Sequence, residues 1–204
     1  PPSSSRSMIV LEWAANMMQL RSGKFDLETY LSIMSQKMNT NDHFQADYSL
    51  VDLALNSYSD DGQRHYANIY AKGALAAGLL DIRLLELSKG ERGLCEVIQT
   101  LAGKYGPTKA FPEDKFFKQF VDMTHPEVAQ FIDAHIKGFE PLPVAEYYAK
   151  LGISYQDEVN TGNKKADLGM DIKPTADLRF KVVEVNPELA EMGLVVGDIL
   201  KVYN

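Results

Sequence analysis

The stretch RHYANIYAKGALAAGLLDIRLLEL, residues 64–87, is the longest apolar-periodic segment of the chain. Its apolar residues recur at helical spacing and on more than one face, which is typical of a helix that packs against several neighbours. Gly90 follows soon after and favours a helix end. We therefore predict that this helix is the central, most buried element of the fold, with Leu75 and Leu79 in the core.

Shorter helical patterns lie on both sides of this segment. Asp26 is placed to cap the second of them, and Pro112 to open another as its first helical residue. Together the patterns predict about seven helices with no internal repeat. The remaining predicted ranges are residues 8–20, the segment after Asp26 to about 38, 50–55, 94–105, the segment from Pro112 to Val121, 125–138 and 143–152.

The pattern changes after Gly152. Residues 156–167 are polar and rich in turn formers, which favours a loop or hairpin connection. Strands are predicted at 179–185 and 198–203, with one or two helical turns at 188–192. The predicted fold is thus mainly α with a small β-rich module, and the domains are residues 1–152 and 153–204.

The amino-acid composition argues against a nucleic-acid partner and against a membrane-spanning helix. The formal net charge is −7 and no long basic run occurs, which argues against a nucleic-acid partner. No apolar stretch reaches the roughly 18 residues of a membrane span. Cys95 is the single cysteine and lies on an apolar helix face, so we expect a small core residue. Residues 1–7 lack a signal-peptide pattern, and both cytoplasm and cell envelope stay open as compartments.

Tyr70-Ala71-Lys72-Gly73, followed by Leu79-Leu80-Asp81, is the most informative short motif. It resembles the Tyr-x-Lys-Gly helix of gluzincin zinc aminopeptidases, in the form found in the glycyl aminopeptidase family. Other segments agree with that family in order and spacing, and the resemblance covers nearly the whole chain. These segments are 12–14, 17–23, 138–140 and 142–143. The resemblance implies the C-terminal, helical part of a metallopeptidase catalytic domain.

A second resemblance concerns the end of the chain. Ala190-Glu191-Met192-Gly193-Leu194 and Gly197-Asp198-Ile199-Leu200 are similar to a PDZ module, which binds an extended peptide at a sheet edge. By this resemblance, Leu168, Gly169 and Met170 are candidates for the loop that holds the peptide carboxylate, although a simple turn is an equal alternative. The module is partial within these residues, so we expect self-association through it and weak peptide binding.

The peptidase resemblance also implies a function and a catalytic residue. The parent enzyme would remove small N-terminal residues such as Gly or Ala from peptides. Tyr70 would donate a hydrogen bond to the oxyanion of the tetrahedral intermediate. The alternative for Tyr70 is plain helix packing. We expect Lys72 to be a solvated helix lysine, Glu12 a surface carboxylate, and His65 to have no part in the site.

The zinc ligands themselves are missing from the sequence. A zinc site of this type needs a His-Glu-x-x-His helix and a carboxylate ligand. The four histidines, at 43, 65, 125 and 135, form no such motif, and the family's ligand position falls on Met8, with Ile9 after it. We therefore expect no zinc and no activity in this chain, and zinc in a full-length parent. Two alternatives remain: a non-catalytic scaffold or peptide-binding protein with the same fold, and an unrelated helical interaction domain without a sheet after residue 152.

Overall fold

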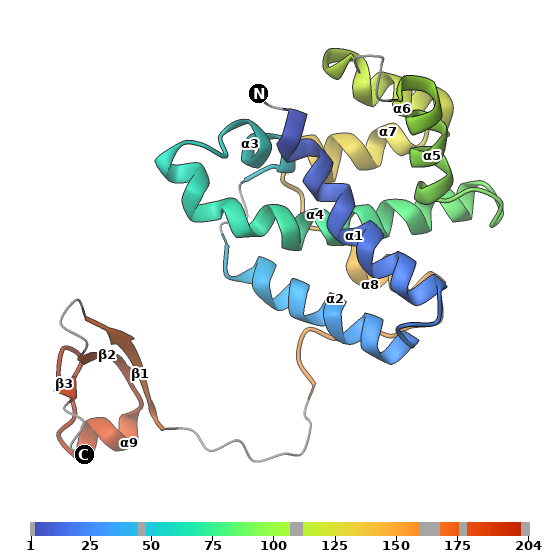
Figure 1. The fold of residues 1–204 in the computed structure, drawn as a ribbon. Coiled ribbons are helices and arrows are strands. Elements are labelled where there is room, and N and C mark those ends of the chain that lie inside the picture. The colour runs from blue at the N-terminus through green and yellow to red at the C-terminus, as the bar shows by residue number, and fades with distance from the viewer. Residues whose placement is uncertain (1–2, 45–47, 107–111, 160–167, 176–178, 201–204) are drawn as a thin grey trace. The chain divides into compact units, whose positions relative to one another are not determined.

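Helix α4 (Asp60–Leu87) runs through the middle of the helical part of the molecule (Figure 1). All of its residues from Ala71 to Ala77 are buried, and Leu79 is only 2% exposed. The predicted central helix is confirmed. It begins at Asp60 rather than Arg64 because the Ser59 side chain accepts a hydrogen bond from the Gly62 amide and caps the first turn.

The computed structural model describes residues 3–44, 48–106, 112–159, 168–175 and 179–200. The side chains of residues 3–10 and of Glu113 lie outside this description. The chain divides into two units, residues 1–156 and 157–204, and each is described by itself.

Three helices from the first third of the chain pack against α4. They are α1 (Ser3–Arg21), α2 (Leu27–Asp42) and α3 (Leu50–Leu55). The predicted cap is present, because Asp26 accepts a hydrogen bond from the Thr29 amide at 2.8 Å. Trp13 of α1 is fully buried and belongs to the same core cluster as Leu79 and Leu84 of α4.

The second half of the helical unit completes this core. It contains α5 (Leu94–Tyr105), a 3₁₀ turn (Glu113–Lys115), α6 (Phe116–Met123), α7 (Val128–Phe131), a π-helical turn (Ile132–Lys137) and α8 (Val144–Lys150). Pro112 opens the 3₁₀ turn rather than an α-helix, and its carbonyl accepts from the Lys115 amide. The π-helical turn closes at Gly138, whose amide donates to the Asp133 carbonyl at 2.9 Å.

Asp81 ties α4 to the start of α5. Its carboxylate accepts a hydrogen bond from the Leu94 amide at 2.6 Å, while the Gly93 amide donates to the Glu96 carboxylate. Asp81 is only 3% exposed, and burial raises the pKa of its carboxyl although the Leu94 bond and Arg21 oppose the shift. The buried aspartate therefore acts as a structural cap for α5.

The second unit contains a three-stranded antiparallel sheet in the order β1-β2-β3. The strands are β1 (Met170–Pro174), β2 (Phe180–Val185) and β3 (Ile199–Leu200), and helix α9 (Pro187–Glu191) follows β2. β2, α9 and the start of β3 match the predicted elements, whereas β1 was not predicted. The rest of the last predicted strand, residues 201–203, lies outside the described residues. A sheet after residue 152 contradicts the hypothesis of an all-helical interaction domain.

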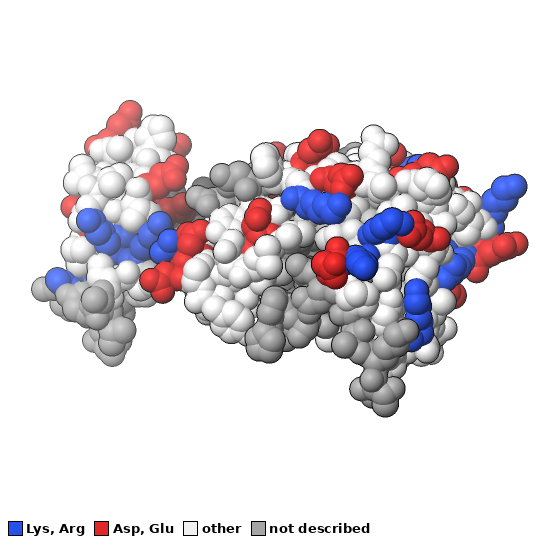
Figure 2. All heavy atoms as spheres, turned by 90° about the horizontal axis from the view of Figure 1, so that it is seen from above, with Lys and Arg blue, Asp and Glu red and all other residues white. Residues whose placement is uncertain are grey.

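The surface carries charges of both signs. On the face shown in Figure 2, Lys and Arg side chains alternate with Asp and Glu over the helical unit and do not gather by sign. Ion pairs join some charged side chains of this unit, such as Lys150 with Glu86 at 2.7 Å. Within the described ranges, no helix has the length and apolar composition of a membrane span.

Candidate functional site

Tyr70 lies in the first half of α4 and is half-buried. Its hydroxyl oxygen is 3.4 Å from that of Tyr66, one turn earlier, and the two rings meet edge to face with centroids 5.7 Å apart. The hydrogen bond with Tyr66 is the main reason why the pKa of Tyr70 lies above its ordinary value, and the negative charge of Glu12 adds to the effect. Tyr70 is therefore a protonated phenol at neutral pH, able to donate one hydrogen bond.

Glu12 of α1 lies near Tyr70 and links α1 to α2 through an ion pair. Its carboxylate accepts a hydrogen bond from Lys37 Nζ at 2.6 Å, and the Lys37 side chain is only 14% exposed. The predicted surface carboxylate is thus half of an ion pair that links two helices. A partly shielded pair of this kind is more favourable than an exposed one, because solvent screens it less.

Lys72 differs from the prediction of a solvated lysine. Its residue is 6% exposed, and Nζ donates to the Tyr48 carbonyl at 2.8 Å. Burial lowers the pKa of Lys72 from its ordinary value. Two residues along a helix correspond to a rotation of about 200°, so Lys72 projects away from the face of Tyr70. The motif therefore does not bring the two side chains to one site.

His65 and its neighbours form a second polar group, which sequence reasoning missed. The His65 ring is buried, stacks on Tyr48 with centroids 4.9 Å apart, and lies 6.0 Å from the Phe44 ring. The Tyr48 hydroxyl in turn donates to the Asp61 carboxylate at 2.6 Å. Spacing contained a signal, because positions 61, 65, 68 and 72 recur at the interval of one helix face. We call Phe44, Tyr48, Asp61 and His65 the α4 polar cluster.

Two polar atoms along this face have no partner among the described residues: His65 Nδ1 and Asn68 Oδ1. Asn68 is 2% exposed, and a buried carbonyl oxygen without a hydrogen-bond partner costs stability. The α4 polar cluster nevertheless does not include Tyr70, because His65 is five residues away from Tyr70 along the helix.

The candidate peptide loop of the second unit is partly absorbed into the sheet. Met170 belongs to β1 and pairs with Val185, and the Gly169 carbonyl accepts from the Asn186 amide at 2.8 Å. Gly169 has φ of +70°, and a Cβ there would lie 2.7 Å from Asn186 Nδ2, so both conformation and packing require glycine. Leu168, two residues before the strand begins, is exposed.

Zinc is the cofactor that the peptidase resemblance implies, and the residues present do not fit it. Among the described residues, no group of three or more His, Cys, Asp and Glu side chains is placed to hold a metal ion. The sequence puts the thioether of Met8 where a carboxylate ligand would be required, and a thioether is a poor match for zinc beside nitrogen and oxygen donors.

Comparisons with known proteins identify no family for this chain. No protein-family model matches the chain. Searches of curated proteins and of solved structures give no significant match. The functional argument therefore depends on the sequence and the geometry of the site.

Proposed function

We propose that residues 1–156 are the helical, substrate-contacting part of a gluzincin-type aminopeptidase domain, and that residues 157–204 belong to a PDZ-like module. The observation that supports this proposal is the position of Tyr70. Its side chain is half-buried and its hydroxyl remains protonated, and it belongs to the Tyr-x-Lys-Gly motif of α4. Glu12 of α1 lies close enough for its negative charge to raise the pKa of Tyr70. The substrate class, by resemblance, is a peptide with a small N-terminal residue.

The role proposed for Tyr70 is hydrogen-bond donation to the oxyanion that forms when the peptide carbonyl is attacked. A preorganised neutral donor contributes to catalysis because it stabilises charge that develops in the transition state. Tyr66 would orient the Tyr70 hydroxyl through the contact of 3.4 Å between the two oxygens. We assign no metal to residues of this chain, so the reaction would require ligands from sequence beyond these residues.

The first test is metal analysis and aminopeptidase assay of the 204-residue chain. We expect less than stoichiometric zinc after dialysis and no release of Gly or Ala from short peptides, because the ligand set is missing. About one tightly held zinc per chain, bound through histidines, would contradict the proposal that this chain supplies no zinc ligands.

The second test addresses Tyr70 in an active full-length homologue. Replacement of the corresponding tyrosine by Phe should lower kcat by about 10²–10³ with little change in KM. The matched control is Phe at the position of Tyr66, which removes the neighbouring hydroxyl and should have a much smaller effect. Equal effects of the two substitutions would mean that the hydroxyl pair acts structurally.

A second function, peptide binding without hydrolysis, is favoured by Met8 and Ile9 at the ligand position. It predicts that the full-length gene product also binds no zinc but retains affinity for peptides with small N-terminal residues. Metal analysis of that product separates the two functions, since only the peptidase needs the ion.

A further inference from the structure

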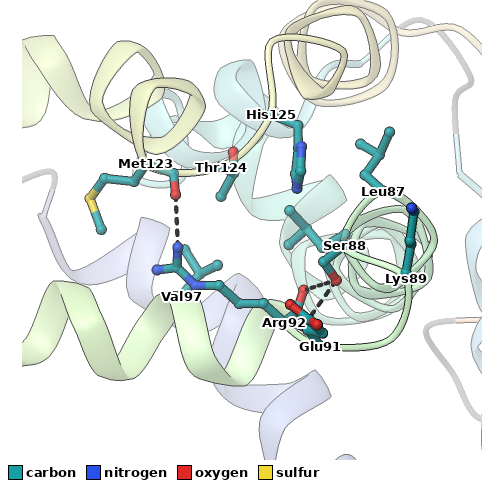
Figure 3. Close-up of a pocket in the computed structure, with 10 residues that line it drawn as sticks. Leu87, Ser88, Lys89, Glu91, Arg92, Val97, Met123, Thr124 and His125 are labelled. Carbon is teal, nitrogen blue, oxygen red and sulfur yellow. Dashed lines mark hydrogen bonds between the residues drawn. The ribbon is translucent and has the colours of Figure 1, made fainter.

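A pocket of about 480 Å³ lies where the end of α4, the following loop, α5 and the α6–α7 turn meet (Figure 3). Its apolar residues Leu84 and Val97 are almost completely buried, so they offer a ligand little surface. The Arg92 guanidinium donates to the Met123 carbonyl at 2.9 Å and to Thr100 Oγ1 at 3.0 Å. The protein's own contacts thus occupy these groups, and we assign no ligand to this pocket.

Strand β1 is a better candidate for an interaction surface, because it lies at the edge of the three-stranded sheet, beside β2 (Figure 1). Within the described residues, no strand pairs with its other side. Four of its five residues, Asp171 to Pro174, are exposed. An exposed edge strand can accept a further strand through its backbone N–H and C=O groups.

The bonds at the two ends of β1 show which of its backbone groups face outward. The Gly169 carbonyl accepts from the Asn186 amide at 2.8 Å, and the Thr175 amide donates to the Arg179 carbonyl at 2.8 Å. Both odd-numbered residues therefore direct backbone groups towards β2. Because these groups alternate between the two sides of a strand, the even-numbered residues of β1 direct theirs towards the outer edge.

The register at Ile172 gives the same assignment. Ile172 lies opposite Val182 of β2. The Val182 amide donates to the Asp198 carbonyl at 2.8 Å, and the Val182 carbonyl accepts from the Gly197 amide at 2.9 Å. The backbone groups of Val182 thus face the β3 side, so those of Ile172 face the outer edge.

The charged side chains of β1 lie opposite like charges on β2. Asp171 is paired in register with Glu184, and Lys173 with Lys181. Asp171 and Lys173 are two residues apart, so both pairs lie on one face of the sheet, with an acidic end and a basic end. Like charges directly opposite each other are destabilising. An added strand with the reverse order of charges would therefore be favoured at this edge.

We propose that β1 pairs with β1 of a second copy of the chain, antiparallel and centred on Ile172. This arrangement puts Asp171 of each copy opposite the partner's Lys173, so that the acidic end of one sheet meets the basic end of the other. The two Ile172 residues exchange two hydrogen bonds, and each Met170 N–H donates to the carbonyl of the partner's Pro174. The two sheets become one sheet of six strands.

The charges select this register. An axis at Asp171 or at Lys173 would place each of these residues opposite its own copy, which brings like charges together. Pro174 lacks an N–H and removes one hydrogen bond on each side of the axis, but its carbonyl still accepts. The interface depends on the register and charges of the sheet alone, so it does not rest on the proposed peptidase function.

The first test is sedimentation equilibrium of the 204-residue chain, combined with amide hydrogen exchange at several protein concentrations. We expect a reversible dimer with a Kd below about 1 mM that weakens as salt is added, because the ion pairs are exposed. The amides of Met170 and Ile172 should become more protected as the concentration rises, while those of Asp171 and Lys173 are bonded to β2 in either state. A chain that stays monomeric, or a dimer that leaves these two amides unprotected, would overturn the proposal.

Charge exchange tests the register. Asp171→Lys and Lys173→Glu should each weaken self-association about tenfold or more, because both ion pairs become pairs of like charge. Each change also places an opposite charge beside Glu184 or Lys181 within one copy, so folding is not threatened. Lys118→Glu on α6 is the matched control for net charge and should leave the Kd unchanged.

The two single variants also complement each other. An equimolar mixture of Asp171→Lys and Lys173→Glu should form a heterodimer about as tight as the wild-type dimer, because each ion pair is restored with one residue from each copy. The double variant should likewise associate with itself. Wild-type self-association of either single variant, or a mixture no tighter than the single variants alone, would show that this edge is not the interface.

Discussion

Gly93 shows how tightly one residue position is determined at the junction of α4 and α5. A Cβ on Gly93 would lie 2.4 Å from Asp81 Oδ1, whereas one on Gly103 of the same helix would meet nothing within 4 Å. We expect Gly93→Ala to reduce the free energy of unfolding by about 1–3 kcal/mol, because the cap must shift. Gly103→Ala should raise it by about 0.5–1 kcal/mol through helix propensity. Urea unfolding measures both, and an equal effect of the two changes would contradict the cap geometry.

Lys72 predicts a pH dependence of stability. Its pKa in the folded state is depressed below 10.5 by burial. A depressed pKa means that the group stabilises the fold above pH 10.5 and that this contribution is lost as the pH falls through the folded-state pKa. The stability of the wild type minus that of Lys72→Met should therefore increase from pH 7 towards pH 10.5. The exposed substitution Lys118→Met serves as the control, and a flat difference for Lys72→Met would mean that burial imposes no cost.

At the scale of elements, α4 holds the helical unit together. Leu75 and Leu79 are 4% and 2% exposed, while Leu11 of α1 is 62% exposed. We expect Leu75→Ala or Leu79→Ala to cost about 2–5 kcal/mol through lost burial and a residual cavity. Leu11→Ala, an identical chemical change on a helix, should stay within about 0.5 kcal/mol. Thermal unfolding of the three variants tests this, and similar melting temperatures for all three would contradict the central position of α4.

Elements with strong periodicity and caps could be predicted from the sequence, whereas those set by tertiary contacts could not. α5 has the predicted bounds because its apolar positions recur clearly at helical spacing, and α3 has them although its pattern is looser. The π-helical turn at Ile132–Lys137 was predicted only as helix, since one extra residue per turn leaves no distinct pattern in the sequence. Strand β1 was missed because Met170-Asp171-Ile172 is short and mixed, and its pairing with β2 makes it a strand.

The candidate site residues also differ in whether the sequence alone could reveal their surroundings. Tyr70 was identified by a motif, and its half-buried position follows from the helix register. The burial of Lys72 depends on the Tyr48 carbonyl, which is 24 residues away in the sequence, so local composition could not reveal it. The hydrogen bond from Arg92 to the Met123 carbonyl likewise spans 31 residues of sequence, so only tertiary packing reveals it.

At the scale of the whole molecule, the second unit has little core of its own. Among its described residues, Val182 is fully buried, while Leu168, Met192, Val195 and Val196 are exposed. A unit of this size buries only a modest part of its surface, so the hydrophobic contribution to its folding is small. The outer edge of a strand in a small sheet can also pair with another chain. We therefore expect self-association of the chain through this apolar surface.

This expectation predicts weak binding of C-terminal peptides by the 204-residue chain, with a Kd above about 100 µM. Titration of a small peptide library measures the affinity, and sedimentation at several concentrations shows whether self-association competes. Gly169→Ala should unfold or loosen the sheet unit, because its Cβ would press on Asn186, whereas Gly193→Ala has a similar positive φ but nothing within 4 Å. Gly193→Ala is therefore the control for backbone strain alone. A saturable low-micromolar complex that Gly169→Ala abolishes and Gly193→Ala preserves would show a complete groove formed at Leu168–Met170, and the weak-binding prediction would be wrong.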